Sequence, residues 1–459
     1  MARTFDLAIR GATVISDGAL PRDVLIRGGR VAALVEPGAA DADEEIDARG
    51  LYALPGAVDA HVHFNEPGRT VWEGWERGSR GAASGGTTTV VDMPLNSLPP
   101  TLDGVSFDAK RAAAERSSVV DFALWGGLVS ADRPPLRELA ERGAVGVKGF
   151  LCDSGVPEFP SLPGAALGDA LAAAKATGLL VALHCEDEAL VREATTAALR
   201  QAPRDLDAWS SSRPVEAERR AVARACAAAK ATGASLHVVH LSSAAALDVV
   251  ALSRSAGVDV SVETCPHYLV FDDDDLRRAG AALKCAPPIR SSREREALWE
   301  ALLGGRIDLV ASDHSPCAAE SKQAPDAFAA WGGVTGVQSL LPSMLSAALR
   351  RAAGTPDPAA ILGFIAWRLA ARPAQRLGLW PRKGRIAAGS DADIVLLDVR
   401  QKWTLEPAAL ETRSGQSPYL GRTFRGLIHA TLVRGRIVYR DGRSVADPGY
   451  GRFVRPDRG

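Results

Sequence analysis

Eight short apolar segments recur along the middle of the chain, and their alternation with helix-like stretches constrains the fold more than any other feature. The segments are Leu54–His63, Thr87–Met93, Val119–Leu128, Val145–Leu151, Leu179–Cys185, Ser235–Leu241, Val258–Thr264 and Ile307–Ser312. Ala-rich amphipathic stretches separate several of them, namely Ala165–Thr177, Val215–Thr232 and Ala244–Ala256. Buried strands that alternate with helices are typical of a parallel sheet covered on both faces. Eight units over about 250 residues predict an α/β fold of the (β/α)8 TIM-barrel type. An open, doubly wound sheet is the alternative, but no GxGxxG turn follows the first segment.

The two ends of the chain have a different texture from the middle. Short β-forming segments separated by Gly turns occupy both ends, for example Arg30–Val35, Gly384–Ile386 and Ala430–Tyr439. Chain termini often lie close together in a folded protein. We therefore expect residues 1–53 and 380–459 to form one small β-sandwich domain, and residues 54–379 to form the barrel domain.

Composition excludes several classes of partner. The 459 residues carry a formal net charge of −1, so the chain has no basic footprint for nucleic acid or for an anionic membrane surface. No run of about 18 apolar residues predicts a membrane span, and residues 1–10 lack the apolar core of a signal peptide. The six Cys are scattered without a CxxC pair, which favours free thiols. The expected location is the cytoplasm.

Histidine is scarce in this chain, and its placement is informative. Of the eight His, all but His429 lie at or just beyond the ends of the predicted strands. His61 and His63 end the first strand with a spacing that places both rings on one side. His184 and His240 end the fifth and sixth strands. In a barrel the carboxyl ends of the strands share one mouth, so these four rings predict a metal site there.

Three further residues near strand ends allow more than one interpretation. Asp313 follows the eighth strand, where it is either a metal ligand or a helix N-cap or turn residue. His237 lies on an apolar strand and suits an ordinary core position. His267 either packs in the core or supports a metal ligand from behind.

Lys148 lies within the fourth apolar segment, in a chain that has only eight Lys among its 54 basic residues. A Lys buried beside divalent metals has its pKa lowered by desolvation and by charge repulsion, which leaves a neutral amine. Such an amine reacts with carbon dioxide to form a carbamate, an anionic ligand that can bridge two metals. The alternative is a Lys that reaches the rim of the barrel and pairs there with an acid.

Together these residues predict a site for two divalent metal ions. The proposed ligands are His61, His63, Lys148, His184, His240 and Asp313. Water between two such ions loses a proton near neutral pH, and the ions polarise a carbonyl under attack. Asp313 would act as the catalytic proton acceptor and pass the proton to a leaving nitrogen. The ligand types suit zinc best, with manganese, cobalt and iron as alternatives.

Several longer motifs extend this pattern over nearly the whole chain. They are Asp59-Ala-His-Val-His-Phe-Asn-Glu-Pro-Gly-Arg-Thr, Gly85-Gly-Thr-Thr-Thr-Val-Val-Asp-Met-Pro-Leu-Asn-Ser, Val147-Lys-Gly-Phe-Leu-Cys-Asp-Ser-Gly, Glu263-Thr-Cys-Pro-His-Tyr-Leu, Lys284-Cys-Ala-Pro-Pro-Ile-Arg, Ser312-Asp-His-Ser-Pro-Cys and Ser417-Pro-Tyr-Leu-Gly-Arg-Thr. On these motifs the chain resembles the cyclic amidases of the amidohydrolase superfamily, a group that includes dihydroorotases and hydantoinases. Within that group it is most similar to the allantoinases.

The resemblance implies an N6-carboxylated Lys148, formed with carbon dioxide or bicarbonate, and metal ligation by the six residues named above. It also implies the terminal β domain, hydrolysis of allantoin to allantoate in purine catabolism, and a homotetramer.

Differences from the neighbouring groups indicate the substrate. Dihydroorotases typically carry Arg where this chain has Asn65, and His where it has Cys317, to hold a substrate carboxylate. Hydantoinases and dihydropyrimidinases usually have a Tyr shortly after the carboxylated Lys, and this chain has none there. A pocket without those cations suits a neutral, ureido-rich substrate. The expected substrate contacts are Asn65, Asn96 and Cys317. A non-catalytic scaffold relative would be expected to lack metal ligands, and all six are present.

Overall fold

The computed structural model describes residues 5–16, 18–129, 135–200, 204–352 and 357–458, and its centre is built from parallel strands. The strands are β6 (Ala57–Val62), β7 (Thr87–Asp92), β8 (Asp121–Leu124), β9 (Gly126–Gly127), β10 (Gly146–Phe150), β11 (Leu180–His184), β12 (Leu236–Val238), β13 (Val260–Thr264) and β14 (Leu309–Val310). They form one sheet in the order β6-β7-β8 and another in the order β14-β13-β12-β11-β10-β9. All of these pairings are parallel, so the prediction of an α/β fold with a parallel sheet is confirmed.

The two parallel sheets contact each other where their outer strands meet. Val62 at the end of β6 forms a parallel bridge with His314, shortly after β14. At the same point the backbone N–H of His63 donates to the carbonyl of His314 at 2.7 Å. The last strand of one sheet therefore lies beside the first strand of the other.

Two of the predicted strands are interrupted. The first run divides at Gly56 into β5 (Tyr52–Pro55) and β6, which belong to different sheets. A Cβ at Gly56 would lie 2.2 Å from the side chain of Thr88, so the close approach of the chain to Thr88 admits only Gly. The third run divides into β8 and β9 at Trp125.

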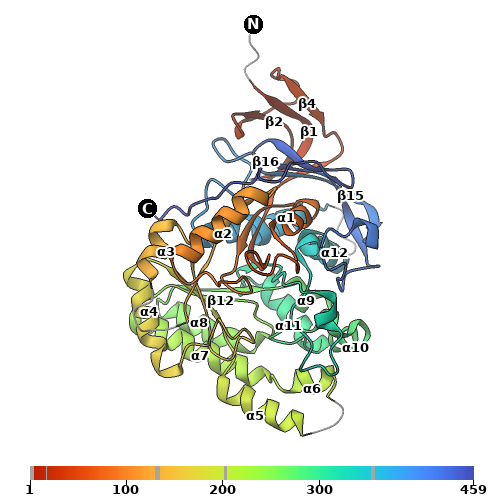
Figure 1. The fold of residues 1–459 in the computed structure, drawn as a ribbon. Coiled ribbons are helices and arrows are strands. Elements are labelled where there is room, and N and C mark those ends of the chain that lie inside the picture. Colours follow the sequence, from red (N-terminus) through yellow and green to blue (C-terminus); the bar gives the residue numbers. More distant parts are fainter. Residues whose placement is uncertain (1–4, 17, 130–134, 201–203, 353–356, 459) are drawn as a thin grey trace.

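Helices cover the parallel strands (Figure 1). They are α1 (Trp75–Ser84), α2 (Gly104–Ser117), α3 (Leu136–Arg142), α4 (Leu167–Ala176), α5 (Glu188–Leu199), α6 (Leu206–Ser211), α7 (Val215–Thr232), α8 (Leu247–Ser255), α9 (Pro266–Val270), α10 (Asp273–Ala279), α11 (Ser292–Leu303), α12 (Leu340–Arg351), α13 (Ala359–Ala366) and α14 (Arg372–Arg376). Local signals set their ends: α2 begins with a capping box between Asp103 and Ser106, and α7 ends at Gly233 in the left-handed conformation. The predicted helix Val215–Thr232 is confirmed with the same bounds.

Strands from both ends of the chain lie together in a separate sheet, at the top of Figure 1. They are β1 (Leu7–Ser16), β2 (Gly18–Arg27), β3 (Arg30–Val35), β4 (Glu44–Asp47), β5, β15 (Ile394–Thr404), β16 (Thr423–Val433), β17 (Arg436–Arg440) and β18 (Arg443–Ser444). Their order is β18-β17-β16-β15-β5-β1-β2-β3, with β4 paired to β1. The pairing of β15 with β5 joins the two ends of the chain.

Two details of the terminal β-segments were wrong in the sequence prediction. The segment Gly384–Ile386 is not a strand, because the chain turns there and Gly384 has a positive φ of 83°. Ala430–Tyr439 is not one strand but the end of β16 and the start of β17, joined by a tight turn at Arg434-Gly435.

A buried ion cluster connects the terminal sheet to the parallel strands. The Lys383 ammonium lies 2.5 Å from Asp121 on β8, 3.0 Å from Asp391 and 2.7 Å from Asp393, and all four side chains are buried. The three carboxylates could have been a metal site by their grouping, but Lys383 already supplies the positive charge among them.

Replacing Lys383 with Met is expected to destabilise the protein, because it removes the ammonium that contacts all three buried carboxylates. Asp121 keeps its ion pair with Arg434 and Asp391 keeps its pair with Arg382, so the main loss falls on Asp393. Breaking a buried ion pair in this way costs about 3–5 kcal/mol of unfolding free energy. The loss can be measured as a shift of the denaturant midpoint. Lys230→Met, at an exposed position on α7, is the matched control and should change the free energy by less than about 0.5 kcal/mol. Equal midpoints for the two variants would contradict a structural role for the cluster.

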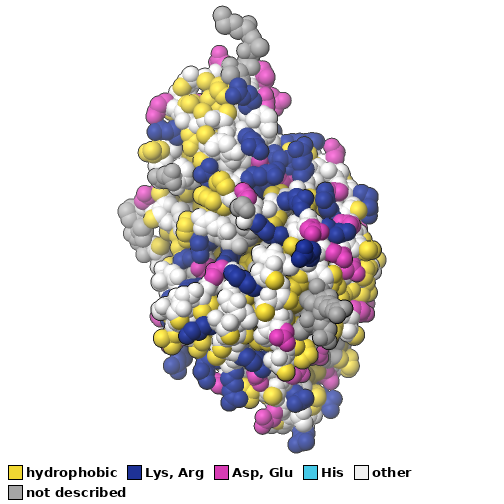
Figure 2. All heavy atoms as spheres, turned by 90° about the vertical axis from the view of Figure 1, so that its left-hand side faces the viewer, with side chains coloured by type: hydrophobic (Ala, Val, Ile, Leu, Met, Phe, Trp, Pro, Cys, Tyr) yellow, Lys and Arg dark blue, Asp and Glu magenta, His cyan; other side chains and the backbone are white. Residues whose placement is uncertain are grey.

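The surface has no single dominant charge. On the face shown in Figure 2, basic and acidic side chains are interspersed, which agrees with the net charge of −1. Within the described ranges, no helix combines the length and the apolar character needed to cross a bilayer.

Candidate metal centre

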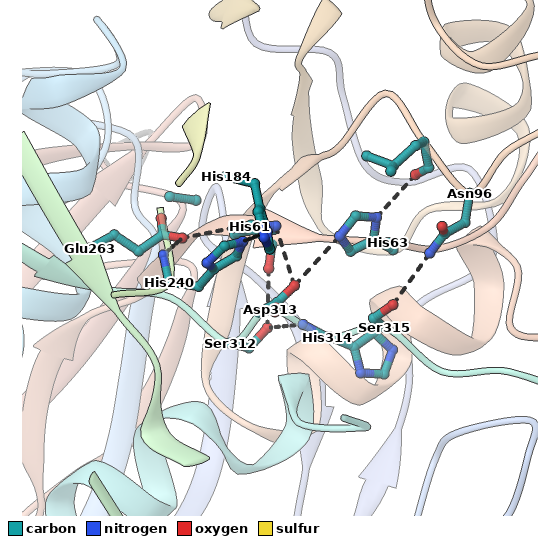
Figure 3. A network of polar contacts seen from close by, with 12 residues as sticks. His61, His63, Asn96, His184, His240, Glu263, Ser312, Asp313, His314 and Ser315 are labelled. Carbon is teal, nitrogen blue, oxygen red and sulfur yellow. Dashed lines mark hydrogen bonds and ion pairs between the residues drawn. The ribbon is translucent and has the colours of Figure 1, made fainter. Parts of the chain in front are cut away.

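The predicted metal ligands come together near the carboxyl ends of the parallel strands, and Figure 3 shows the four histidines and Asp313 among them. His61 lies in β6 and is buried. Its Nδ1 contacts Oε1 of Glu263 on β13 at 2.7 Å, while its Nε2 lies 3.2 Å from Oδ1 of Asp313. Glu263 therefore fixes the ring so that one nitrogen is held from behind and the other faces the centre.

His63 and Asp313 complete one half of the centre. His63 Nδ1 lies 3.0 Å from the carbonyl of Leu95, and its Nε2 lies 3.5 Å from the same Asp313 oxygen that faces His61. His61, His63 and Asp313 each offer a ligand atom within 4.8 Å of the others. Two imidazoles and one carboxylate at this spacing suit a divalent transition metal.

His184 and His240 form the other half. Nδ1 of His184 lies 3.1 Å from Nε2 of His240, and Nε2 of His184 contacts Glu186 at 2.7 Å. Glu186 also pairs with Arg213. The His61 and His240 rings lie 5.5 Å apart between centroids, so the two halves adjoin.

Lys148 lies on β10 beside these residues. Its side chain is 1% exposed, and its Nζ has no hydrogen-bond partner among the described residues. The ring centroid of Phe150 lies 4.8 Å from Nζ, and that ring stacks on His184. The alternative of a Lys that pairs with an acid at the rim is therefore wrong, because the amine is buried and forms no ion pair among the described residues.

Burial and charge set the protonation of the centre in predictable directions. Burial lowers the pKa of His61, His184 and His240, so all three rings are neutral. Burial also lowers the pKa of Lys148 to about 8. Burial opposes ionisation of Asp313, but the direct contacts of its carboxylate with the ring nitrogens of His61 and His63 favour the ionised form and hold its pKa well below the usual range. The centre thus presents neutral imidazoles and an ionised carboxylate.

Three residues of the site have left-handed backbone conformations that residues other than Gly rarely adopt. The φ angles are 63° at Asn65, 39° at His240 and 44° at Asp313. Each of these residues follows the end of a strand, where the chain must turn sharply. Such conformations persist at functional sites because the surrounding structure enforces them.

A cavity of about 560 Å³ opens onto the centre, a volume that suits a small-molecule ligand. His61, His63, Lys148, His184, His240 and Asp313 all line it. Asn96 lines it as well, and its amide donates to the hydroxyl of Ser315 at 3.3 Å.

Asn65 and Cys317 lie behind the cavity wall rather than in it. Asn65 is 1% exposed, and its amide donates to the carbonyl of Pro316 at 2.9 Å. Cys317 is buried near Lys322, in a separate small pocket. The structure therefore brings together Asn96 and the six predicted ligands, and it places Asn65 and Cys317 one layer further out.

The residues that sequence reasoning missed are mostly the partners of the ligands. Glu263 and Glu186 orient His61 and His184, and Arg213 neutralises Glu186. Glu186 stands only two positions after His184, which was a usable signal. Glu263 is 202 residues from His61 and had no such signal.

Two of the three remaining strand-end histidines, His237 and His267, differ in their surroundings. His237 contacts Ser261 and Glu263 through its two ring nitrogens, as expected of a satisfied core residue. His267 is buried beside Asp313 and Cys265, and neither of its ring nitrogens has a hydrogen-bond partner in the described part of the chain.

Comparison with known proteins gives one consistent result. A model of the amidohydrolase family matches residues 52–438. The chain is 47% identical to an allantoinase of Rubrobacter xylanophilus, over 99% of this chain and 98% of that protein. It is 44% identical to an allantoinase of Deinococcus radiodurans, over 99% of each. Among solved structures, the L-hydantoinase (dihydropyrimidinase) from Arthrobacter aurescens matches with a TM-score of 0.94 at 32% identity, covering 98% of this chain and 100% of the other.

Proposed function

The chain belongs to the amidohydrolase family, and on that premise we propose that it hydrolyses the ring amide of allantoin to allantoate. One observation carries this proposal: 47% identity to an allantoinase over nearly the full length of both chains. The hydantoinase-like structures are less similar in sequence, at 32% identity or below for those compared.

The fold that supports this activity is, we propose, a closed (β/α)8 barrel made of residues 54–379. The bridge between Val62 and His314 supports closure, because it connects the strands at the two ends of the series. Residues 1–53 and 380–459 would form the small β-sandwich domain. We also propose a homotetramer located in the cytoplasm.

The residues of the centre fit a pair of divalent metal ions. The set of possible donors consists of neutral imidazoles, the ionised Asp313 and the buried amine of Lys148, which has no hydrogen-bond partner among the described residues. These are the ligand types that divalent transition metals prefer. His61, His63, His184, His240, Asp313 and Lys148, carboxylated on Nζ with carbon dioxide or bicarbonate, would hold the ions, for which zinc is our proposal. When bound, such ions supply an activated water and polarise the carbonyl.

The chain's own residues then perform the proton transfers. Asp313 faces the cavity and stays ionised, so it can take a proton from the attacking water. The water oxygen bonds to the ring carbonyl carbon, and Asp313 returns the proton to the ring nitrogen as the carbon–nitrogen bond breaks. Asn96 lines the cavity and can bind a ureido group of the substrate, while Asn65 and Cys317 would support that wall from behind.

Rates on four substrates test the proposed specificity. The purified protein should hydrolyse allantoin with a kcat/KM at least about tenfold above its values for dihydroorotate, dihydrouracil and hydantoin, a difference of about 1.4 kcal/mol in transition-state binding. A higher value for hydantoin or dihydrouracil would transfer the assignment to the hydantoinase group. No hydrolysis of any of them by metal-loaded protein would favour a non-catalytic scaffold.

Metal removal is expected to abolish activity. Dialysis against a strong chelator should remove the divalent ions and abolish the hydrolysis of allantoin at the same time. The proposed mechanism needs the ions to activate the attacking water. Adding back zinc with bicarbonate should restore the rate. Full turnover by protein shown to be metal-free by elemental analysis would reject the metal-dependent mechanism.

A further inference from the structure

One wall of the cavity is a single segment without regular secondary structure. Six consecutive residues, from Phe328 to Gly333, all line the cavity. None of them lies in a helix or a strand. A segment of this kind keeps its shape only if its backbone is held from outside, because it has no hydrogen-bond ladder of its own.

Two lysines hold this segment by its carbonyl groups. The Lys284 ammonium donates to the carbonyl of Phe328 at 3.4 Å and to that of Ala330. The Lys322 ammonium donates to the carbonyls of Trp331 at 3.0 Å and Gly333 at 2.6 Å, and also to Ala281 at 2.9 Å. Four of the six wall carbonyls are therefore bound by two side chains, and Lys322 uses all three of its donors.

The two lysines, one buried and one half-buried, are unusual in their partners. Lys284 is 3% exposed, and no ion pair with a carboxylate accompanies either ammonium within the described residues. Burial lowers the pKa of each to about 8, and the two charges also repel each other. A cation satisfied only by neutral carbonyls contributes little to net stability. The arrangement is better explained by the precise shape it imposes on the segment.

Lys284 is itself fixed in place by aromatic and backbone contacts. Its Nζ lies 3.9 Å from the ring centroid of Trp209, and that ring packs edge-to-face on Phe328. The backbone N–H of Gly333 donates to the carbonyl of Lys284 at 2.7 Å. Lys284 therefore contacts the segment near both of its ends, through its ammonium at Phe328 and through its carbonyl at Gly333.

Gly333 connects the segment to Ser315, which lies close to Asp313 in the stretch that follows β14. Gly333 has a φ of 147°, and a Cβ there would lie 2.3 Å from the carbonyl oxygen of Ser315. Ser315 follows Asp313 by two residues, and it accepts the hydrogen bond from Asn96. A shift of the wall would therefore move the side of the cavity where Asn96 lies.

We propose that Lys284 and Lys322 are positioning residues that hold residues 328–333 as the substrate-facing wall and thereby determine how tightly the substrate binds. The inference rests on the proposed function for the identity of the substrate. The shape of the wall follows from the contacts of the two lysines and does not depend on the proposed function. We assign neither lysine a step in the reaction: Lys322 spends all three donors on carbonyls, and Lys284 spends two of its three on the wall.

Methionine variants of the full, metal-loaded protein test this. Lys284→Met and Lys322→Met keep the length of the side chain but remove its donors. Each should raise KM for allantoin by about tenfold or more, the cost of losing charged hydrogen bonds, while kcat stays within about threefold. Metal content should equal that of the wild type. Lys230→Met on α7 removes an exposed Lys and should change none of these values.

Hydrogen exchange separates this inference from the proposed function, because it needs no substrate. Peptides that cover residues 323–334 should exchange faster in both Met variants than in the wild type, while peptides from β6 and β10 should not change. Wild-type exchange in this segment, or a wild-type KM at full metal content, would overturn the inference. If the wild type hydrolyses no allantoin, the exchange result still decides whether the lysines hold the wall.

A milder variant covers the case in which a Met variant does not fold. Lys322→Arg keeps the positive charge, but its planar head cannot direct donors to three carbonyls as an ammonium does. It should fold, retain metal and show a raised KM with faster exchange at 323–334. Wild-type values for both would contradict the positioning role.

Discussion

Replacing Lys148 with Ala is expected to remove metal and activity together. The Nζ of Lys148 is buried without a hydrogen-bond partner in the described structure, and a carbamate on it would be the anion that joins the two halves of the centre. Losing a residue that merely orients a ligand costs about 10–100-fold in metal affinity or activity, so losing a bridging ligand should exceed about 100-fold. Elemental analysis of the purified variant and its rate on allantoin measure the two effects.

The control for this prediction lies in the same cavity. Lys284→Met also removes a buried Lys that lines the cavity, yet it should keep its metal. Short carboxylic acids should partly restore Lys148→Ala by replacing the carbamate, and they should not improve Lys284→Met. Normal metal content in Lys148→Ala would remove Lys148 from the ligand set.

Replacing Asp313 with Asn should lower kcat by about 10²–10⁴-fold, the range that general acid–base catalysis contributes. The amide has nearly the same shape as the carboxylate but cannot take a proton from water. KM should change much less, because the cavity wall that includes Asn96 is left intact. Steady-state kinetics on allantoin at several pH values measure both constants.

Asp153→Asn provides the comparison for Asp313→Asn, since Asp153 is an exposed acid that lines the same cavity. It should keep kcat within a few-fold of the wild type. A kcat for Asp313→Asn within tenfold of the wild type would exclude Asp313 as the proton carrier.

The parts of the fold and site that follow a local pattern were predictable from the sequence. The strands that hold His61, Lys148 and His184 are continuous apolar runs, and such runs are decided by composition over a few residues. The placement of ligands at the ends of those strands then follows from parallel topology. For this reason all six predicted ligands line one cavity.

The parts that were missed depend on contacts between distant residues. The break at Gly56 exists because Thr88 on a neighbouring strand approaches the backbone, which no local pattern reveals. Glu263 contacts His61 from 202 residues further along the chain, which no local pattern reveals either. Asn65 was expected to face the substrate, but its left-handed backbone turns its amide toward Pro316.

The left-handed conformations of Asn65, His240 and Asp313 have a consequence for selection and for engineering. A residue other than Gly in this region carries a backbone cost of roughly 1–2 kcal/mol, so the catalytic mouth is formed at the expense of the stability of the whole chain. A screen for thermal stability alone would therefore favour Gly at these positions and select proteins that are more stable but inactive. Directed evolution of a more stable variant should therefore select for catalytic activity and for thermal stability in the same round.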